Sequence, residues 1–402
     1  MINLEVPKKF TDLVNQARQS ATEFFRPNSR KYDRAEHTYP TELDMLSSVL
    51  DGLNDAGQGA SGASGVRQSS GNNEGGTRNG GNLSTVLGSI ELCWGDVGLL
   101  LSLPRQGLGN AAIASVANDE QAERFAGKWA AMAITEPDCG SDSAAIRTTA
   151  ERDGDHYVLN GSKIFVTSGE RADAVVVWAT LDPELGRAAI KSFVVERDTP
   201  GFELVRLEHK LGIRASDTAE FRLQNVRVHE DNLLGSPEID TERGFAGVMQ
   251  TFDNTRPLVA AMAVGVAKAA LEETRAVLAE AGVEPDYDLP ANSQHAAAAT
   301  LLQLEADWEA AYFLTLEAAW MADNSQPNSL QASMAKAKSG RVGTDITLKC
   351  VELCGTMGYS ENNLLEKWGR DAKILDIFEG TQQIQQLIVA RRLLGKSSKE
   401  LR

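Results

Sequence analysis

The sequence predicts a mainly α-helical protein with a central β-domain, because hydrophobic patterns of two different periods alternate along its 402 residues. Apolar residues follow the helical period over much of 1–130 and 241–402, whereas short β-favouring runs separated by turns fill 131–240. Strands that follow one another without intervening helices favour an antiparallel barrel or sandwich. We therefore expect an N-terminal helical domain, an antiparallel β-domain and a C-terminal helical domain, in that order.

The N-terminal zone has helical patterns on both sides of a polar tract. The stretch "TELDMLSSVLDGLNDAG" has helical spacing and ends on Gly57, and helical patterns resume with "LSTVLGSIELCWGDVGLLLSL" and "DEQAERF". About residues 57–82 are rich in Gly, Ser and Asn, which predicts a long surface loop or a disordered insert. A G-x-G-x-x-G pattern begins at Gly57, but a dinucleotide fingerprint needs a strand before it and a helix after it, so this match predicts no nucleotide site.

The central zone consists of short strand patterns. In "AAIRTTAERDGDHYVLNGSKIFVT" the turn dipeptides Asp153-Gly154 and Asn160-Gly161 separate β-favouring runs. The series continues with "ADAVVVWATL", "AIKSFVVER", "GFELVRL" and "TAEFRLQNVRV".

Four long helices are predicted for the C-terminal zone, which suggests a bundle. The first is "RPLVAAMAVGVAKAALEETRAVLAEA", and the second places Leu301, Leu304, Trp308 and Tyr312 on one face at spacings of three and four. The last two run through "AKAKSGRVGTDITLKCVELCG" and "TQQIQQLIVARRLLG".

Composition and charge exclude several classes of protein. A net charge of −16 and a pI near 4.9 leave no basic face that could neutralise the phosphates of a nucleic acid. The four cysteines are too few and too scattered for a disulfide framework, and the five histidines stand alone, so we expect reduced thiols and no metal site. The N-terminus lacks a signal-peptide pattern and no apolar run reaches membrane-spanning length, which predicts a cytoplasmic protein without a membrane partner.

Two stretches carry candidate chemistry. In "RDAKILDIFEGTQQIQQLIVARRLL" the apolar residues before Glu379 indicate a buried neighbourhood. An unpaired buried polar group costs roughly 2–7 kcal/mol, so Glu379 should be protonated, paired or used in chemistry. The stretch "AMAITEPDCGSD" offers the hydroxyls of Thr135 and Ser141 beside Gly140, where a ligand can approach the backbone; taken alone, it could also be a polar loop that enters the β-domain.

Five stretches together resemble the acyl-CoA dehydrogenase family. They are "MAITEPDCGSD", "NGSKIFVTSG", "HKLGIRASDTAEFRLQNVRVHEDNLLG", "FDNTRPLVAAMAVGVAKAAL" and "RDAKILDIFEGTQQIQ", and they run in the family's order over about residues 90–402. The N-terminal part, with its Gly/Ser/Asn tract, matches poorly. The resemblance implies an N-terminal helical domain, an antiparallel β-barrel and a C-terminal four-helix bundle. It also implies an FAD-dependent oxidoreductase that acts on the CH–CH bond of an acyl-CoA thioester.

The resemblance further implies a mechanism. In such an enzyme a base removes the α-proton of the thioester while the β-hydrogen leaves as hydride to flavin N5. Glu379 falls on the family's base position, where desolvation should raise its pKa and make it a stronger base. In one branch of the family the base lies on the first helix of the final domain, but this chain has Thr255 at that position, and a threonine cannot serve.

By the same resemblance, other residues contact cofactor and substrate. Those expected at FAD are Met132, Ile134, Thr135, Gly140, Ser141, Phe165, Thr167, Thr381 and Gln383. Those expected at the acyl-CoA are Ser141, Asp253, Thr255, Arg256 and Gly380, whose N–H would meet the thioester carbonyl. An electron-transfer flavoprotein is the expected electron acceptor.

Several alternatives stay open within this fold. The chain could be an acyl-CoA oxidase, it could act on an acyl group held by a carrier protein, or it could be a non-catalytic structural subunit. A nitroalkane-oxidising relative is disfavoured because it would carry Asp as base, and flavin monooxygenase relatives are disfavoured because they generally lack the base.

The sequence departs from the family where one subunit reaches its neighbour's flavin. Members that bind flavin across a dimer carry Arg-x-x-Phe-Gly after the first long helix, and this chain has Ala281 in place of the Arg and Glu284 in place of the Phe. Glu352 stands where an uncharged donor usually faces phosphate, and a carboxylate there would repel the pyrophosphate. These losses favour the catalytic half of a hetero-oligomer, as in bacterial α2β2 members that degrade bulky acyl-CoAs such as steroid side chains. The alternative is a homotetramer that binds the ADP part of FAD through other contacts.

Overall fold

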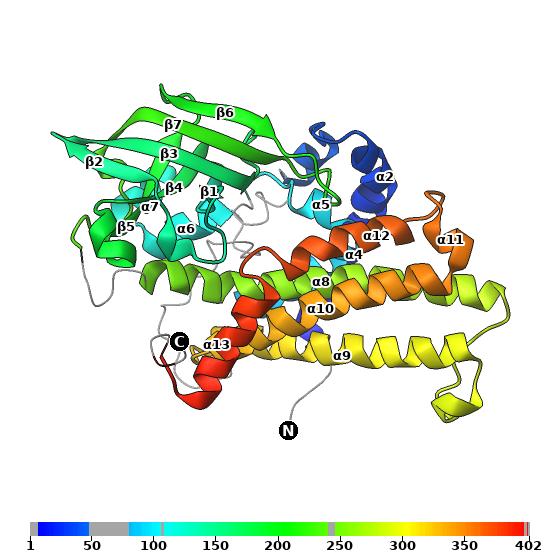
Figure 1. Ribbon diagram of the computed structural model, residues 1–402. Coiled ribbons are helices and arrows are strands. Elements are labelled where there is room, and N and C mark those ends of the chain that lie inside the picture. Colours follow the sequence, from blue (N-terminus) through cyan, green and yellow to red (C-terminus); the bar gives the residue numbers. More distant parts are fainter. Residues whose placement is uncertain (1–6, 48–79, 106–107, 240–245, 398–399, 401–402) are drawn as a thin grey trace.

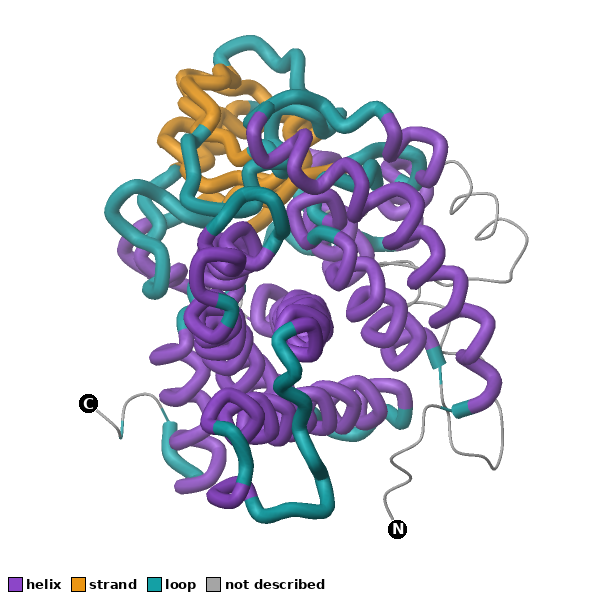
Figure 2. Tube along the Cα trace, turned by 90° about the vertical axis from the view of Figure 1, so that its right-hand side faces the viewer, coloured by secondary structure: helices purple, strands orange, loops and turns teal. Residues whose placement is uncertain are grey.

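A computed structural model of the chain describes residues 7–47, 80–105, 108–239, 246–397 and 400, with the side chains of 246–254 outside the description. Three zones follow one another: helices, a curled sheet, and long helices again (Figure 1). Figure 2 shows the strands gathered at one end of the molecule, beside the helical domains. The predicted fold class is therefore confirmed, while the domain boundaries stay predictions.

The N-terminal zone is built from short helices. They are α1 (Thr11–Ser20), a π-helical turn (Ala21–Phe25), α2 (Arg26–Arg34), α4 (Gly81–Gly95), α5 (Val97–Leu100), α6 (Leu108–Val116) and α7 (Asp119–Phe125). Residues 42–47 are also helical, but the rest of the predicted helix before Gly57, the G-x-G-x-x-G pattern and most of the Gly/Ser/Asn tract lie outside the described residues. α4 begins at Gly81, so the tract ends slightly earlier than expected.

Local sequence explains where two of these helices begin. Asp96 adopts an extended conformation that ends α4, and its side chain accepts a hydrogen bond from the Leu99 N–H (2.8 Å) as the N-cap of α5. The predicted helix over 83–103 is therefore interrupted. Asn118 and Gln121 form a capping box at the start of α7, which satisfies two backbone donors there.

Seven strands form the central sheet. They are β1 (Ala130–Ala133), β2 (Thr149–Asp153), β3 (His156–Thr167), β4 (Ala174–Thr180), β5 (Ile190–Glu196), β6 (Phe202–Leu207) and β7 (Thr218–His229). Their order is β1-β4-β2-β3-β7-β6, with β5 paired to β4. The Val-rich β4 is buried along its whole length because both of its faces are covered: Val175 and Val177 join one core cluster, and Val176 joins a second cluster that includes residues of α6. One detail of the prediction was wrong: the sheet is mixed, since β4 pairs in parallel with β1 and, at one residue pair, with β2.

The two predicted turn dipeptides differ in outcome. Asp153-Gly154 turns the chain between β2 and β3, with Gly154 at φ 67°. Asn160-Gly161 forms no turn; β3 passes straight through it, with a register shift against β7 between Leu159 and Gly161. A Cβ at position 161 would lie 2.5 Å from Thr148 Oγ1, so this glycine permits close strand packing instead of a reversal.

The C-terminal zone is a bundle around α10. Its helices are α8 (Ala246–Glu280), α9 (Ala296–Asp323), α10 (Ser329–Leu353), α11 (Gly355–Tyr359), α12 (Leu365–Ala372) and α13 (Gln382–Leu394), with a 3₁₀ turn at Lys373–Asp376. The predicted face of α9 is confirmed: Leu301 is 0% exposed, and Trp308 stacks on Tyr312 at 5.1 Å between ring centroids. Burying a leucine fully stabilises the fold by about 1.5–3 kcal/mol, so such faces hold the bundle together.

Two expectations about the whole chain can be compared with the described residues. All four cysteines are free, as predicted, and all four are buried. Within the described ranges, no helix is long and apolar enough to span a membrane.

Candidate active site around Glu379

Glu379 lies in a tight turn between the 3₁₀ turn Lys373–Asp376 and α13. Its backbone has φ 56° and that of Gly380 has φ 89°, two consecutive residues in the left-handed region. A non-glycine residue held there costs of order 1–3 kcal/mol, and such strain clusters at functional sites. Gly380 also leaves room for a neighbour, because a Cβ on it would lie 2.4 Å from the Gln385 side-chain nitrogen.

The carboxylate of Glu379 meets α8 and α10. Its Oε2 accepts a hydrogen bond from Thr255 Oγ1 at 2.9 Å. Burial raises the pKa of Glu379, and this outweighs the opposing influence of the Thr255 hydrogen bond and of the positive charges of Arg256 and Lys336. A carboxylate with a raised pKa is a better proton acceptor, so the turn presents a general-base candidate.

The surroundings of Glu379 are less uniformly buried than the sequence predicts. Leu375 is 0% exposed, and Ile374 and Phe378 are partly buried against the bundle core. Ile377, however, is 46% exposed, since the 3₁₀ turn points it outward. The apolar pattern therefore described one side of the turn only.

The α8 residues expected at the substrate are partly assembled around Glu379. Thr255 and Arg256 are buried at 7% and 3% exposure, and both act on Glu379 as described. Asp253 lies in α8, but its side chain falls outside the described residues.

A second group of predicted residues gathers where β1 meets β3. Met132 lies in β1, with Ile134 and Thr135 directly after it. The Thr135 carbonyl accepts from the Ile164 N–H (2.9 Å), and the Ile134 carbonyl accepts from Lys163 Nζ (3.1 Å). The Thr135 loop is thus fixed to β3 through its backbone, which leaves its side chain available to a ligand.

A buried ion pair that the sequence reading missed supports this loop. Lys163 is 0% exposed, and its Nζ lies 2.7 Å from Glu136 Oε1. Glu136 also accepts from the Thr148 hydroxyl and N–H and from the Arg147 N–H. Burial opposes the charge of Glu136, but Lys163 and these hydrogen bonds outweigh it and lower the pKa of the carboxyl. Side chains alternate between the two faces of a strand, so Lys163 falls on the same face of β3 as the buried Tyr157 and Leu159. A lysine on that apolar face was the available clue.

Phe165 has the features of a cofactor platform. It is 60% exposed at φ 59°, in the β-bulge where the register of β3 against β7 shifts between Lys163 and Val166. A bulge re-aims a side chain, and an exposed aromatic face suits stacking on a planar ring. Thr167 ends β3 two residues later. These residues, with the hydroxyl of Thr135, fit a flavin ring chemically.

The other predicted cofactor residues adjoin these two groups: Gly140 lies beside Thr135, and Thr381 directly follows Gly380. Gly140 and Ser141 are exposed at the end of the Thr135 loop. Thr381 is the N-cap of α13 and accepts from the Ile384 N–H at 3.4 Å, while Gln383 is exposed on the first turn. A helix N-terminus favours anionic groups, and the expected contact with the FAD phosphates stays a prediction.

Two buried side chains beside Glu379 were not anticipated. Lys336 on α10 donates to the Gly380 carbonyl at 2.7 Å, and Gln385 on α13 donates to the carbonyls of Glu379 (3.0 Å) and Gly380 (3.2 Å). Burial lowers the pKa of Lys336 to about 8, against the attraction of Asp376 and Glu379. Lys336 shares the buried face of α10 with small residues such as Ala332 and Ala335, and a lysine on such a face was a usable clue.

The histidines do not stand alone as predicted. His37 and His209 lie with ring centroids 5.0 Å apart, and His156 and His229 form a second pair. With Glu36, the first pair could offer three ligand atoms within 4.8 Å of one another. Within this group His209 Nδ1 lies 2.8 Å from Glu36 Oε2, so these two side chains already share a hydrogen bond with each other.

Comparison with known proteins places these features in a family. Residues 131–226 match the family profile "Acyl-CoA dehydrogenase, middle domain", and residues 242–394 match "Acyl-CoA dehydrogenase, C-terminal domain". A short-chain-specific acyl-CoA dehydrogenase of Clostridium acetobutylicum is 36% identical over 266 residues, which are 66% of this chain and 68% of that protein.

Two solved structures extend the comparison to nearly the whole chain. Butyryl-CoA dehydrogenase from Megasphaera elsdenii is 29% identical with a TM-score of 0.82, covering 98% of this chain and 100% of that chain. The prolyl acyl carrier protein oxidase AnaB is 27% identical with a TM-score of 0.80, covering 97% of this chain and 100% of that chain. The N-terminal zone, which matches poorly in sequence, is therefore included in the structural match.

Proposed function

Because the chain belongs to the acyl-CoA dehydrogenase family, we propose that it oxidises an acyl-CoA thioester to the α,β-unsaturated product with FAD, using Glu379 as the base. The observation that carries the proposal is the strained, partly buried turn that holds the Glu379 carboxylate against Thr255 with a raised pKa. The Thr135 loop, Phe165 and Thr167 would hold the flavin ring, and the N-terminal end of α13 its phosphates.

The residues of this chain divide the work between binding and proton transfer. Glu379 takes the α-proton, and the Gly380 N–H stabilises the negative charge that develops on the thioester oxygen. Arg256 and Lys336 favour the ionised form of Glu379, so the carboxylate is ready to accept the proton. Bound FAD supplies the acceptor that takes the β-hydrogen as hydride, which completes the two-electron oxidation.

Loss of the base alone tests the assignment. Glu379→Gln keeps the size of the side chain, and general-base catalysis typically contributes 10²–10⁴-fold, so anaerobic bleaching of the flavin by acyl-CoA should slow at least about 10²-fold. Flavin content should stay at the wild-type level. The exposed Glu151→Gln is the matched control and should bleach at the wild-type rate. A Glu379→Gln enzyme that bleaches as fast as the control contradicts the assignment.

The acyl group and the electron acceptor are also proposals. A relative named short-chain-specific makes butyryl-CoA the first substrate to test, followed by longer and bulkier thioesters. Electron-transfer flavoprotein is the proposed acceptor. The likeness to a carrier protein oxidase favours one alternative, in which dioxygen is the acceptor and the acyl group is held by a carrier protein. Hydrogen peroxide formed in stoichiometric amount with product would support that alternative.

We also propose that the chain works with a related partner subunit that supplies contacts to the ADP part of FAD. Ala281, just after α8, and Glu284 are exposed, and Glu352 near the end of α10 is exposed in an ion pair with Lys349. None of these side chains offers a phosphate donor. If the chain purified alone is colourless and becomes stoichiometrically yellow when co-expressed with a related subunit, the proposal is supported. A fully yellow homotetramer would contradict it.

A further inference from the structure

The backbone of the Glu379 turn is held by two buried side chains from different helices. Gln385 Nε2 donates to the carbonyl of Glu379 at 3.0 Å and to that of Gly380 at 3.2 Å. Lys336 Nζ donates to the Gly380 carbonyl at 2.7 Å. The two carbonyls on either side of the left-handed Gly380 are therefore both fixed from outside the turn.

Both donors are more buried than their polarity favours. Gln385 is 0% exposed and Lys336 is 1% exposed. Asp376 and Glu379 attract the charge of Lys336, and Arg256 repels it. Burying an ammonium group is costly, and the hydrogen bond to the Gly380 carbonyl helps to offset this cost.

The peptide group explains what these bonds achieve. A peptide bond is planar and trans, so the N–H of Gly380 points opposite to the carbonyl of Glu379. Because Gln385 fixes that carbonyl, it also fixes the direction of the Gly380 N–H. Lys336 fixes the next peptide plane, and its charge acts on the Glu379 carboxylate through space.

We infer that Lys336 and Gln385 form a backbone clamp that orients both the Glu379 carboxylate and the Gly380 N–H toward one substrate. They are positioning residues, since they act through the turn and not on the substrate itself. The inference rests on the proposed function, because it assigns a purpose to the same site. Left-handed φ angles at Glu379 and Gly380 would otherwise relax, and misplacing a reacting group by 1 Å can cost about 10²-fold in rate.

Two substitutions separate the parts of the clamp. Gln385→Met removes the donors to both carbonyls without changing the charge, whereas Lys336→Met removes one donor and one positive charge. Each variant should slow flavin bleaching by about 10–100-fold at saturating acyl-CoA, with KM within about threefold of wild type. Lys338→Met is the matched control on the same helix, because Lys338 pairs with Asp307 at the surface, and it should leave the rate unchanged.

The pH profile adds a readout that loss of packing would not produce. Lys336 lowers the pKa of Glu379, so the acid limb of the rate should move to higher pH in Lys336→Met. The acid limb should keep its wild-type position in Gln385→Met, and Lys336→Arg should also show the wild-type position. The other groups that face Glu379, Thr255 and Arg256, are unchanged in all of these variants.

A spectroscopic measurement keeps the clamp testable apart from turnover. The carbonyl stretch of an enoyl-CoA bound to the oxidised enzyme reports how strongly the Gly380 N–H polarises the thioester, and Gln385→Met should shift it to higher frequency. If none of the acyl-CoA thioesters bleaches the flavin of the wild-type enzyme, the proposed function is refuted and the clamp is not. Folded, flavin-loaded Lys336→Met and Gln385→Met enzymes with the wild-type rate and carbonyl stretch would refute the clamp.

Discussion

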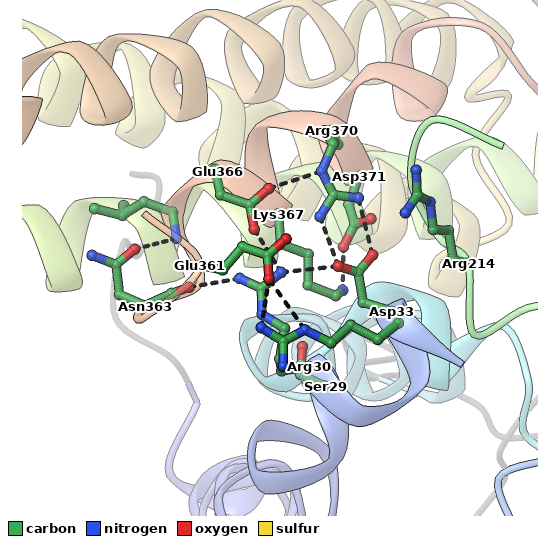
Figure 3. Close-up of polar contacts among 12 residues, drawn as sticks. Ser29, Arg30, Asp33, Arg214, Glu361, Asn363, Glu366, Lys367, Arg370 and Asp371 are labelled. Atoms are coloured by element: carbon green, nitrogen blue, oxygen red, sulfur yellow. Dashed lines mark hydrogen bonds and ion pairs between the residues drawn. The ribbon is translucent and has the colours of Figure 1, made fainter. Parts of the chain in front are cut away.

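Replacing Lys367 with methionine should destabilise the fold by about 3–5 kcal/mol, the cost of breaking a buried ion pair from one side. Lys367 on α12 is 1% exposed and donates to Asp96 Oδ2 at 2.7 Å and to Asp371 Oδ2. Both carboxylates are 0% exposed. Figure 3 shows Lys367 and Asp371 within a larger network of charged groups that joins α12 to α2.

The magnitude follows from the hydrogen bonds that remain. The variant loses two charge-assisted bonds, worth about 1.5–3 kcal/mol each. Asp96 keeps the Leu99 N–H (2.8 Å) and a serine hydroxyl, and Asp371 keeps the Ile213 N–H at 2.6 Å. Neither carboxylate is stripped of all donors, so the loss should fall in the middle of the range. It is still a large part of the roughly 5–15 kcal/mol by which a typical protein is stable.

The loss should shrink as the pH falls. Burial raises the pKa of Asp371 in the wild-type protein, and the charge of Lys367 opposes this rise. Without Lys367 the folded variant binds a proton at Asp371 more tightly than the unfolded chain, whose aspartates have pKa values of about 3.9. The folded state then holds more protons, so the variant's stability falls as pH rises from about 4 through the raised pKa. Its deficit should be larger at pH 8 than at pH 5.

Urea unfolding followed by far-UV circular dichroism measures this, provided the m-value is unchanged. The matched control is Lys349→Met, which breaks an exposed ion pair with Glu352 and should cost less than about 1 kcal/mol. Adding Asp371→Asn to Lys367→Met should recover part of the loss, because one uncompensated charge disappears. A Lys367→Met variant no less stable than the Lys349→Met control at pH 8 would refute the reasoning.

Three further predictions concern the site. Thr255→Val removes a hydrogen bond that lowers the pKa of Glu379, so the acid limb of the rate of flavin bleaching should move to higher pH; an unmoved limb would contradict the assignment. Gly380→Ala places a Cβ 2.4 Å from Gln385 Nε2 in a left-handed turn, and urea unfolding should show a loss of about 1–3 kcal/mol together with a slower rate. Lys163→Met leaves the buried Glu136 carboxylate, which supports the Thr135 loop, without its ion-pair partner. Flavin release on dilution should then show weaker flavin binding, and urea unfolding should show a loss of about 3 kcal/mol in stability.

The sequence was most informative where the period of the apolar residues matches the face that the element buries. The long helices α8, α9, α10 and α13 and the strands from β4 to β7 follow hydrophobic patterns that their packing requires. The turn prediction at Asn160-Gly161 was wrong because the sequence alone does not distinguish a glycine that forms a turn from a glycine that allows close packing. The parallel pairing of β1 with β4 also escaped prediction, since residues 134–173 connect them and no local pattern fixes their direction.

The site was predictable only as far as motifs extend. Glu379, Thr135 and Phe165 could be named because they stand in recognisable stretches, and their roles stay predictions. Gln385 could not be named, because it donates to backbone carbonyls and no residue type in the sequence marks which carbonyls need a donor. Lys336 left one clue, a lysine on a buried helix face, but the Gly380 carbonyl that it meets could not be read from the sequence.

The Glu379 turn is irregular, yet it is anchored on both sides. Upstream, Arg370 on α12 bonds both carboxylate oxygens of Asp33 on α2 (2.9 and 2.7 Å), and Asp371 accepts from the Ile213 N–H between β6 and β7. Downstream, Gln385 holds the turn itself. A site on a loop is placed accurately only when surrounding elements fix the loop, and here all three zones take part. The N-terminal zone, which resembles the family least in sequence, therefore contributes to this anchoring through Asp33.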